Sequence, residues 1–179
     1  MKVIKTRLPG VLIIEPKVFG DARGFFLESY HQQRYRDAGI EWPFVQDNHS
    51  RSRYGVLRGL HFQRTRPQGK LVRVTRGAVY DVVVDINPAS ATCGEHVGVE
   101  LTADDHLQLW VPPGYAHGFC VLSDTADFQY KCTDVYDPED EGGLLWNDPE
   151  LDIAWPLKSP QLSEKDQRHP RLRTLLSGE

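Results

Sequence analysis

The chain has 179 residues, of which 40% are hydrophobic and 26% charged, and its formal net charge is −4. This length and composition predict one globular domain, residues 1–179, with a single core. The acidic balance argues against a nucleic-acid-binding face, and no apolar run approaches the ~20 residues that span a bilayer. We therefore expect neither nucleic acid nor a membrane as a partner.

The cysteine content favours a reducing compartment. Cys93, Cys120 and Cys132 form no Cys-x-x-Cys pair, and their odd number argues against a disulfide framework. We interpret all three as small buried hydrophobes. The start of the chain lacks the layout of a secretory signal. The cytoplasm is the location that these features favour.

The first predicted element with clear boundaries is a helix over residues 29–38, because Ser29 can cap its start and Gly39 follows its end. Alternation with a period of two then dominates the middle of the chain, most clearly in residues 78–86, 107–111 and 128–133. Gly and Pro turn signals separate these runs. Many short strands divided by turns favour an antiparallel sandwich or barrel with no helix in its middle.

A second helical segment is predicted from about residue 163. Ser163 and Asp166 have the spacing of a capping box at its start. Pro170 is expected to interrupt or kink this segment within its first two turns, because proline cannot continue the hydrogen bonding of a helix.

Arginine is concentrated between positions 51 and 76. The cluster comprises Arg51, Arg53, Arg58, Arg64, Arg66, Arg73 and Arg76. The planar guanidinium group suits phosphate, so the cluster is compatible with a small anionic ligand. A solvated rim of loops explains it equally well.

Two histidines stand beside glycines in strand-like settings. His61 follows Gly59-Leu60, and His117 lies in a Pro-x-Gly-x-x-His segment that is similar to half of the cupin signature. The second half, His-x-His followed by Glu, is incomplete, because Gly59 takes the first histidine position and Thr65 and Arg66 stand near that of the Glu. Two histidines without a nearby carboxylate fall short of the three protein ligands of a catalytic metal, so we predict no metal.

A histidine without a metal can act as a general base, because its ordinary pKa lies near working pH. Arg58 and Lys70 lie near His61 in the sequence, and Tyr130 lies on a later predicted strand. A base, a cation and a phenol are the groups needed to break and remake a C–H bond beside a carbonyl. Each also has a purely structural interpretation: a wall histidine, a solvated lysine and a core tyrosine.

The spacing of Arg58 and His61 predicts a break in their strand. They are an odd number of residues apart, so a regular strand would point them to opposite faces. Both can face one cavity only if the strand is interrupted between them. Gly59 is the position at which we predict a bulge.

Ordered blocks along the chain resemble the dTDP-4-dehydrorhamnose 3,5-epimerases. They begin with Phe-Gly-Asp-x-Arg-Gly-Phe-Phe-x-Glu at residues 19–28, Gln-Asp-Asn-His-Ser at 46–50 and Val-Leu-Arg-Gly-Leu-His-Phe at 56–62. Further blocks follow at residues 68–71, 114–119, 130–131, 146–149 and 162–166. The resemblance thus covers nearly the whole chain, and the ordered set is far more specific than any single block.

This resemblance implies a mainly β, double-stranded β-helix (jelly-roll, cupin-like) barrel with short N- and C-terminal helices and no metal or cofactor. It implies a homodimer in which the N-terminal strands cross to the partner subunit. The implied substrate is dTDP-4-dehydro-6-deoxy-D-glucose, and the product, dTDP-4-dehydro-L-rhamnose, serves dTDP-L-rhamnose biosynthesis. The ketone at C4 acidifies the hydrogens on C3 and C5, so both centres can be inverted by proton removal and opposite-face return.

The resemblance also implies roles for individual residues. His61 removes each proton, Asp166 holds its imidazole, Lys70 stabilises the enolate oxygen and Tyr130 returns a proton to the opposite face. Nine further residues are expected at sugar, diphosphate or thymidine: Arg23, Glu28, Gln46, Asp47, Asn48, Arg58, His117, Glu141 and Lys165. Phe19 and Phe26 are expected to flank the thymine, and Arg23 and Glu28 to serve the partner's site.

Some residues keep a structural interpretation beside these roles. The residues alone favour Asp166 as a first-turn acid stabilised by the helix dipole, and only the resemblance makes it a histidine partner. Glu141 belongs to an acidic run of the kind found in solvated loops. Asn87 and Tyr115 depart from the family pattern of Arg and Phe. They leave open a mono-epimerase that acts at C3 or C5 only, on a related nucleotide-linked 4-keto-6-deoxy sugar. A metal-dependent cupin oxygenase or isomerase, and a jelly roll that binds sugar without catalysis, are two further hypotheses.

Overall fold

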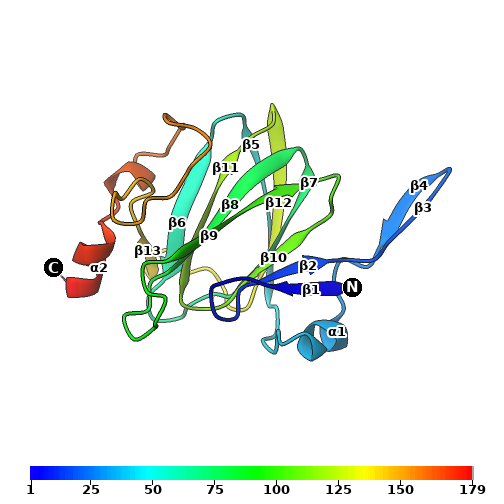
Figure 1. The fold of residues 1–179 in the computed structure, drawn as a ribbon, viewed down its shortest axis with the longest axis horizontal. Helices are drawn as coiled ribbons and strands as arrows, with labels where there is room; N and C mark the ends of the chain where they lie inside the picture. Colours follow the sequence, from blue (N-terminus) through cyan, green and yellow to red (C-terminus); the bar gives the residue numbers. More distant parts are fainter. Residues whose placement is uncertain (179) are drawn as a thin grey trace.

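The computed structural model describes residues 1–178, which form two facing antiparallel sheets and a projecting hairpin (Figure 1). The six-stranded sheet contains, in spatial order, β1 (Lys2–Lys5), β2 (Leu12–Glu15), β10 (Gln108–Val111), β7 (Lys70–Arg76), β12 (Thr125–Cys132) and β5 (Gln46–Arg53). The five-stranded sheet contains β13 (Glu141–Gly143), β6 (Leu57–Gln63), β11 (Tyr115–Val121), β8 (Ala78–Asp85) and β9 (His96–Thr102). The mainly β, jelly-roll class predicted from the sequence is confirmed.

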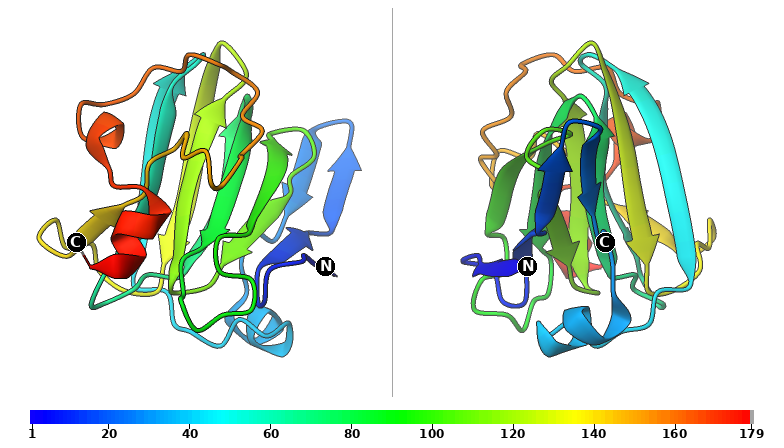
Figure 2. Two further views of the ribbon diagram at one scale, coloured as in Figure 1. Left: turned by 60° about the vertical axis from the view of Figure 1, so that its left-hand side comes forward. Right: turned by 90° about the vertical axis from the view of Figure 1, so that its right-hand side faces the viewer.

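The two remaining strands stand apart from the sandwich. β3 (Val18–Asp21) and β4 (Gly24–Leu27) pair with each other in a separate two-stranded sheet. Figures 1 and 2 show this hairpin extending away from the two main sheets. We call it the arm.

A turn at one glycine connects the two main sheets. Gly77 separates β7 from β8, and its φ of +76° lies in the left-handed region that favours glycine. A Cβ at this position would also overlap Thr125 and Ser123. The apolar run after Lys70 therefore forms two strands in different sheets.

The main core lies between the sheets. It includes Val72 of β7, Val83 of β8 and Phe128 of β12. The opposite face of β8 is also covered, because Val82 and Val84 pack with Leu144, Leu172 and other residues of the C-terminal region. β8 is thus apolar on both faces, and the chain beyond β13 packs on the outer side of the five-stranded sheet (Figure 2).

The N-terminal helix is shorter than predicted. α1 spans Gln32–Asp37, and its N-cap is His31, whose Nδ1 accepts a hydrogen bond from the Arg34 backbone N–H at 3.4 Å. The predicted start at Ser29 is wrong, because the Ser29 carbonyl accepts hydrogen bonds from the Tyr35 hydroxyl of α1 at 3.1 Å and from Gln108 Nε2 of β10 at 2.8 Å. The predicted end is confirmed by Gly39, whose φ is +94°.

The C-terminal helical segment is divided as predicted. Ser163 Oγ accepts a hydrogen bond from the Asp166 backbone N–H at 3.1 Å and opens the 3₁₀ turn η1, Asp166–Arg168. His169 is extended before Pro170, and α2 follows at Leu172–Ser177. Proline therefore ends the first turn, and a separate short helix forms beyond it.

Two of the three cysteines are buried as predicted. Cys120 and Cys132 are free and buried, whereas Cys93 is only partly buried, so its predicted burial is wrong.

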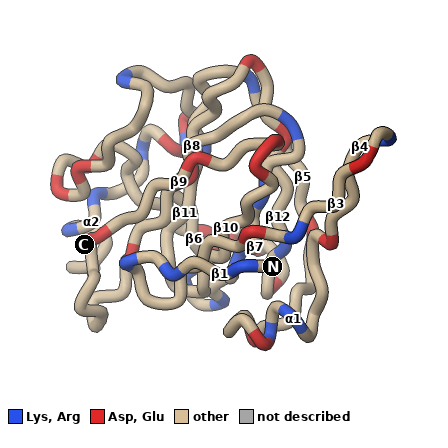
Figure 3. The backbone as a smooth tube through the Cα atoms, turned by 45° about the vertical axis from the view of Figure 1, so that its right-hand side comes forward, with Lys and Arg blue, Asp and Glu red and all other residues tan. Residues whose placement is uncertain are grey.

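Acidic and basic positions are interspersed along the backbone (Figure 3). In residues 1–178, no helix combines the length and the apolar character needed to cross a membrane.

Candidate active site

A cavity of about 610 Å³ gathers most of the predicted site residues. Its lining comes from both sheets and from the C-terminal segment. The predicted residues in this lining are Arg58, His61, Lys70, His117, Tyr130, Glu141, Lys165 and Asp166. A smaller hollow of about 270 Å³ adds Gln46 and Asn48 and shares His61, Lys70 and Tyr130 with the cavity.

The predicted irregularity at Gly59 is present. His61 pairs with His117 and Arg58 with Phe119, so β6 carries one residue more than β11 between these pairs. Gly59 has a φ of +129°, and a Cβ there would overlap the backbone of Gly118. The extra residue lets both Arg58 and His61 line the cavity.

His61 and Asp166 form a close pair. Their Nε2 and Oδ1 atoms are 2.6 Å apart, and the Asp166 side chain is 5% exposed. Burial favours the neutral carboxyl, but the nearby ring nitrogens of His169 and His61 outweigh it and hold the pKa of Asp166 well below its ordinary value. An ionised carboxylate only accepts hydrogen bonds, so His61 Nε2 is the donor in this contact.

Lys70 and Tyr130 project from neighbouring strands of the opposite sheet. Lys70 pairs with Cys132, two residues from Tyr130, so the Lys70 and Tyr130 side chains share one face. Burial lowers the pKa of Lys70, against the raising effect of Cys132, Asp81 and Glu141. Burial also raises the pKa of Tyr130, which keeps the phenol protonated at neutral pH.

Glu141 is a largely buried, hydrogen-bonded carboxylate on a strand, which contradicts its interpretation as part of a solvated loop. It lies on β13 with a 10% exposed side chain. Oε2 accepts hydrogen bonds from the Tyr136 hydroxyl at 2.6 Å and from Lys165 Nζ, and Oε1 is 4.0 Å from His61 Nε2. Burial alone would raise the pKa of Glu141, but the bonds from Lys165 and Tyr136 lower it overall. The same carboxylate raises the pKa of Tyr136 to about 12.

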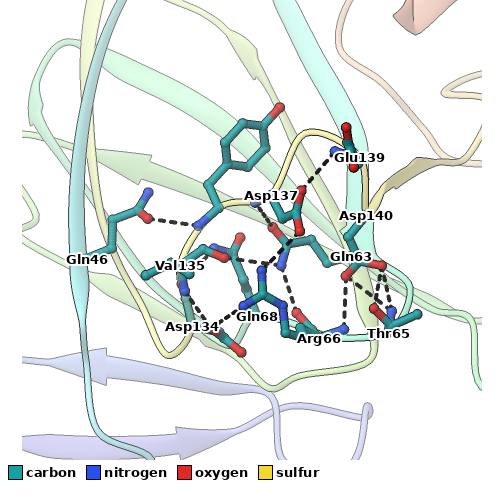
Figure 4. A network of polar contacts seen from close by, with 11 residues as sticks. Gln46, Gln63, Thr65, Arg66, Gln68, Asp134, Val135, Asp137, Glu139 and Asp140 are labelled. Atoms are coloured by element: carbon teal, nitrogen blue, oxygen red, sulfur yellow. Dashed lines mark hydrogen bonds and ion pairs between the residues drawn. The ribbon is translucent and has the colours of Figure 1, made fainter.

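Hydrogen bonds hold the loop that carries Tyr136 at both of its ends (Figure 4). The Tyr136 backbone N–H donates to Gln46 Oε1 at 2.8 Å, and the Asp137 N–H donates to Gln63 Oε1 at 2.9 Å. The Asp140 carboxylate accepts backbone N–H groups of Thr65 and Arg66, each at 2.9 Å. These bonds fix the loop against the end of β6 and place Tyr136 on Glu141.

His117 is buried in the cavity wall. Its Nε2 lies 2.9 and 3.1 Å from the two carboxylate oxygens of Asp81, which is fully buried. Its ring also stacks on Phe128. His117 thus has a fixed orientation beside His61, and its Nε2 is occupied by the contact with Asp81.

The remaining predicted residues lie away from the cavity within one chain. Phe19 and Phe26 are exposed on the arm, and Arg23 pairs with Asp21 at 2.5 Å. Glu28, just after the arm, pairs with Arg34 of α1 at 2.6 Å. Asp47 pairs with Lys131 at 2.9 Å in a separate hollow of about 330 Å³.

One group in residues 1–178 has the composition of a metal site. The donor atoms of His61, Asp166 and His169 all lie within 4.8 Å of one another. However, two ligands of a tetrahedral zinc stand roughly 3.3 Å apart when each metal bond is about 2.0 Å long. The 2.6 Å separation of His61 and Asp166 is that of a hydrogen bond, so a metal would have to part them. The arrangement fits proton chemistry better than coordination.

Sequence reasoning missed three residues here: Tyr136, Asp81 and His169. Tyr136 and Asp81 reach their partners through long-range contacts that leave no local pattern. His169 had a signal, because it follows Asp166 by three residues in a predicted helical turn, the spacing at which side chains meet. The fold also brings a carboxylate to each of the two histidines, Asp166 to His61 and Asp81 to His117, whereas the residues alone indicate none nearby.

Residues 5–174 match the family model of dTDP-4-dehydrorhamnose 3,5-epimerase. The chain belongs to this family. It is 55% identical to the dTDP-4-dehydrorhamnose 3,5-epimerase of Salmonella typhimurium over 100% of both chains. It is 57% identical to that of Escherichia coli K12 over 94% of this chain and 92% of the relative.

A solved structure of this epimerase family agrees with the fold. The crystal structure of dTDP-6-deoxy-D-glucose-3,5-epimerase from Legionella pneumophila, in complex with dTDP-4-keto-L-rhamnose, superposes with a TM-score of 0.94. Its sequence is 52% identical, and the match covers 96% of this chain and 93% of that one. The family assignment places the chain among the isomerases.

Proposed function

We propose that this chain inverts C3 and C5 of dTDP-4-dehydro-6-deoxy-D-glucose and forms dTDP-4-dehydro-L-rhamnose in dTDP-L-rhamnose biosynthesis. The observation that carries the proposal is the 2.6 Å pair of His61 and Asp166 in a cavity that also contains Lys70 and Tyr130. The full-length identity to enzymes named as 3,5-epimerases supports the same substrate.

His61 is the base in this mechanism. Its Nδ1 removes the hydrogen from a sugar carbon beside the C4 ketone, and the imidazole becomes a cation. Asp166 holds the ring through Nε2 and stabilises that cation without becoming protonated. A buried ionised carboxylate is suited to this role because its interaction with the cation is little screened by water.

Lys70 and Tyr130 complete the reaction. The electron pair released from the C–H bond moves onto the C4 oxygen, and Lys70 stabilises the resulting enolate. Tyr130 then gives its proton to the same carbon from the other face as the electron pair returns from the C4 oxygen, which inverts the centre. His61 loses its extra proton to solvent and the Tyr130 phenolate takes one from solvent before the next centre reacts. The positions of His61 and Tyr130 on opposite sheets support this division, since a sugar ring between them would present one face to each.

The other predicted residues bind the nucleotide sugar in this proposal. Within one chain, Gln46, Asn48, Arg58, His117, Glu141 and Lys165 line the two connected hollows. A homodimer supplies the rest: the arm crosses to the partner, where Arg23 and Glu28 contact the ligand and Phe19 and Phe26 flank the thymine. The exposure of Phe19, Phe25 and Phe26 on the arm supports such an interface. Asp47 contributes from the neighbouring hollow.

We assign no metal or cofactor to the reaction, because the base, the acid and the oxyanion stabiliser are all side chains. The cytoplasm is the proposed location. The three free cysteines support it, since thiols persist in a reducing compartment.

The test is isotope exchange in deuterated buffer with chelator-treated protein. The expected result is deuterium at both C3 and C5 of the sugar, followed by NMR, with a loss of about 10²–10⁴-fold in rate for His61→Asn. Deuterium at a single carbon would indicate a mono-epimerase instead. Binding of the dTDP-sugar with no exchange at all would overturn the proposal.

A further inference from the structure

His169 lies against the carboxylate of the proposed catalytic pair but has no place in the reaction described above. Its Nε2 is 3.4 Å from Asp166 Oδ1, the same oxygen that His61 contacts at 2.6 Å. The side chain is 9% exposed, and Nε2 is a buried polar atom without a hydrogen bond of ordinary geometry. Buried polar atoms of this kind call for an explanation.

The protein leaves space for this ring. Gly143 on β13 pairs with His61, and a Cβ on Gly143 would overlap the His169 imidazole. The His169 and His61 rings meet edge to face, with centroids 5.7 Å apart and planes at 81°. Two imidazoles therefore converge on one carboxylate oxygen, and a glycine opposite the first makes room for the second.

His169 is separated from the substrate cavity. It lines an outer hollow together with Arg64, Glu141, Glu164, Lys165 and Arg168, whereas the inner cavity is lined by His61 and Asp166. Because Asp166 is ionised, a nitrogen directed at its oxygen is suited to donate, so His169 Nε2 carries a proton. The ring directs a second N–H group at Asp166 from the side of the outer hollow.

We propose that His169 is a positioning residue, which holds the Asp166 carboxylate in line with His61 through its Nε2–H group. The inference rests on the proposed epimerase function. A carboxylate held only by His61 can turn about its last side-chain bond, whereas two N–H groups from different directions restrict that turn. Partners that orient metal-ligating side chains are typically worth about 10–100-fold in affinity or activity, and we expect a similar effect for a partner that orients this carboxylate.

A pair of variants separates the N–H group from the bulk of the ring. His169→Phe keeps an aromatic ring beside Gly143 but has no donor, and His169→Gln keeps an amide N–H at a similar reach. We expect His169→Phe to lower kcat about 10–100-fold with an unchanged KM, because the residue lies outside the substrate cavity. We expect the kcat of His169→Gln to fall by less than about 10-fold, which is below the range for loss of an orienting partner.

A second measurement needs no substrate. The proton shared by His61 Nε2 and Asp166 should give a far-downfield NMR resonance, and we expect it to move and broaden in His169→Phe but not in His169→Gln. Thermal unfolding of both variants shows whether the fold is kept, and the resonance is compared only in folded protein. If the parent lacks epimerase activity yet the resonance responds, the function is wrong and the positioning role stands.

Three results would overturn the inference. The first is a His169→Phe variant with parental kcat and an unmoved resonance. The second is a rise in KM at constant kcat, which would make His169 a substrate contact. The third is equal loss in His169→Phe and His169→Gln when both are fully folded, which would assign the effect to ring packing.

Discussion

His61 and Tyr130 line one cavity from opposite sheets, His61 on β6 of the five-stranded sheet and Tyr130 on β12 of the six-stranded sheet. In the proposed mechanism the base and the acid would therefore come from two separate layers of the sandwich. A ligand held between the layers is exposed to them on different sides, which suits the removal of a proton from one face of a carbon and its return to the other.

Removal of the Tyr130 hydroxyl should uncouple exchange from inversion. In Tyr130→Phe, His61 can still remove a proton and return one from the same side, so deuterium should enter C3 and C5. Net product should fall by about 10²-fold or more, because the opposite-face acid is gone. NMR of label and of product in the same sample measures both. Parental product formation by Tyr130→Phe would exclude this tyrosine as the acid.

Lys70→Gln should slow proton removal itself. Loss of a group that stabilises a developing oxyanion typically costs about 10²–10³-fold in kcat. The same loss should therefore appear in the exchange rate at both carbons, unlike the Tyr130 result. Lys158, an exposed lysine outside the cavity, gives a matched control in Lys158→Gln. Exchange at the parental rate in Lys70→Gln would remove Lys70 from the enolate.

Gly59→Ala should have a free energy of unfolding at least about 2 kcal/mol below that of the parent. The substitution meets both a φ of +129° and a collision of the new Cβ with Gly118. Gly24→Ala is the control, because Gly24 has a φ of +127° but open space around its Cβ position. Urea unfolding of the two variants separates the backbone penalty from the collision. Equal stability losses would mean that the close approach of β6 and β11 contributes little.

The sequence alone predicts the bulge at Gly59, but it does not predict the long-range contacts that bring other residues to the site. The odd spacing of Arg58 and His61 predicts an interruption at Gly59, since one cavity must receive both side chains. Period-two alternation likewise predicts strands around Val82 and Tyr130, because each residue's face follows from its position. By contrast, Ser29 fails as a cap because its carbonyl accepts hydrogen bonds from the side chains of Tyr35 and of the distant Gln108. Asp81 and Tyr136 are brought to the site by contacts that no local pattern encodes.

Asp166 should make stability depend on acid. Its folded pKa lies below the ordinary value of 3.8, so the carboxylate contributes stability that is complete above that pH. The contribution is lost as the pH falls below 3.8 toward the lower folded pKa. We expect Asp166→Asn to be less stable at neutral pH and to lose less stability than the parent on acidification. Unfolding free energies measured from neutral pH downward, with the exposed Asp104→Asn as control, provide the check. Parallel curves for parent and Asp166→Asn would contradict it.

Exchange of the arm would allow two different inactive variants to form an active site together. Arg23 lies on the arm and His61 in the sandwich, so under the proposed exchange each site in a dimer draws these two residues from different copies. Two inactive proteins, Arg23→Ala and His61→Asn, should therefore complement each other when unfolded together and refolded as a mixture. A mixed dimer assembles one site with both residues intact and one with neither. About a quarter of the parental activity is expected from random pairing. Recovery of that activity would make each catalytic centre the joint property of two polypeptides.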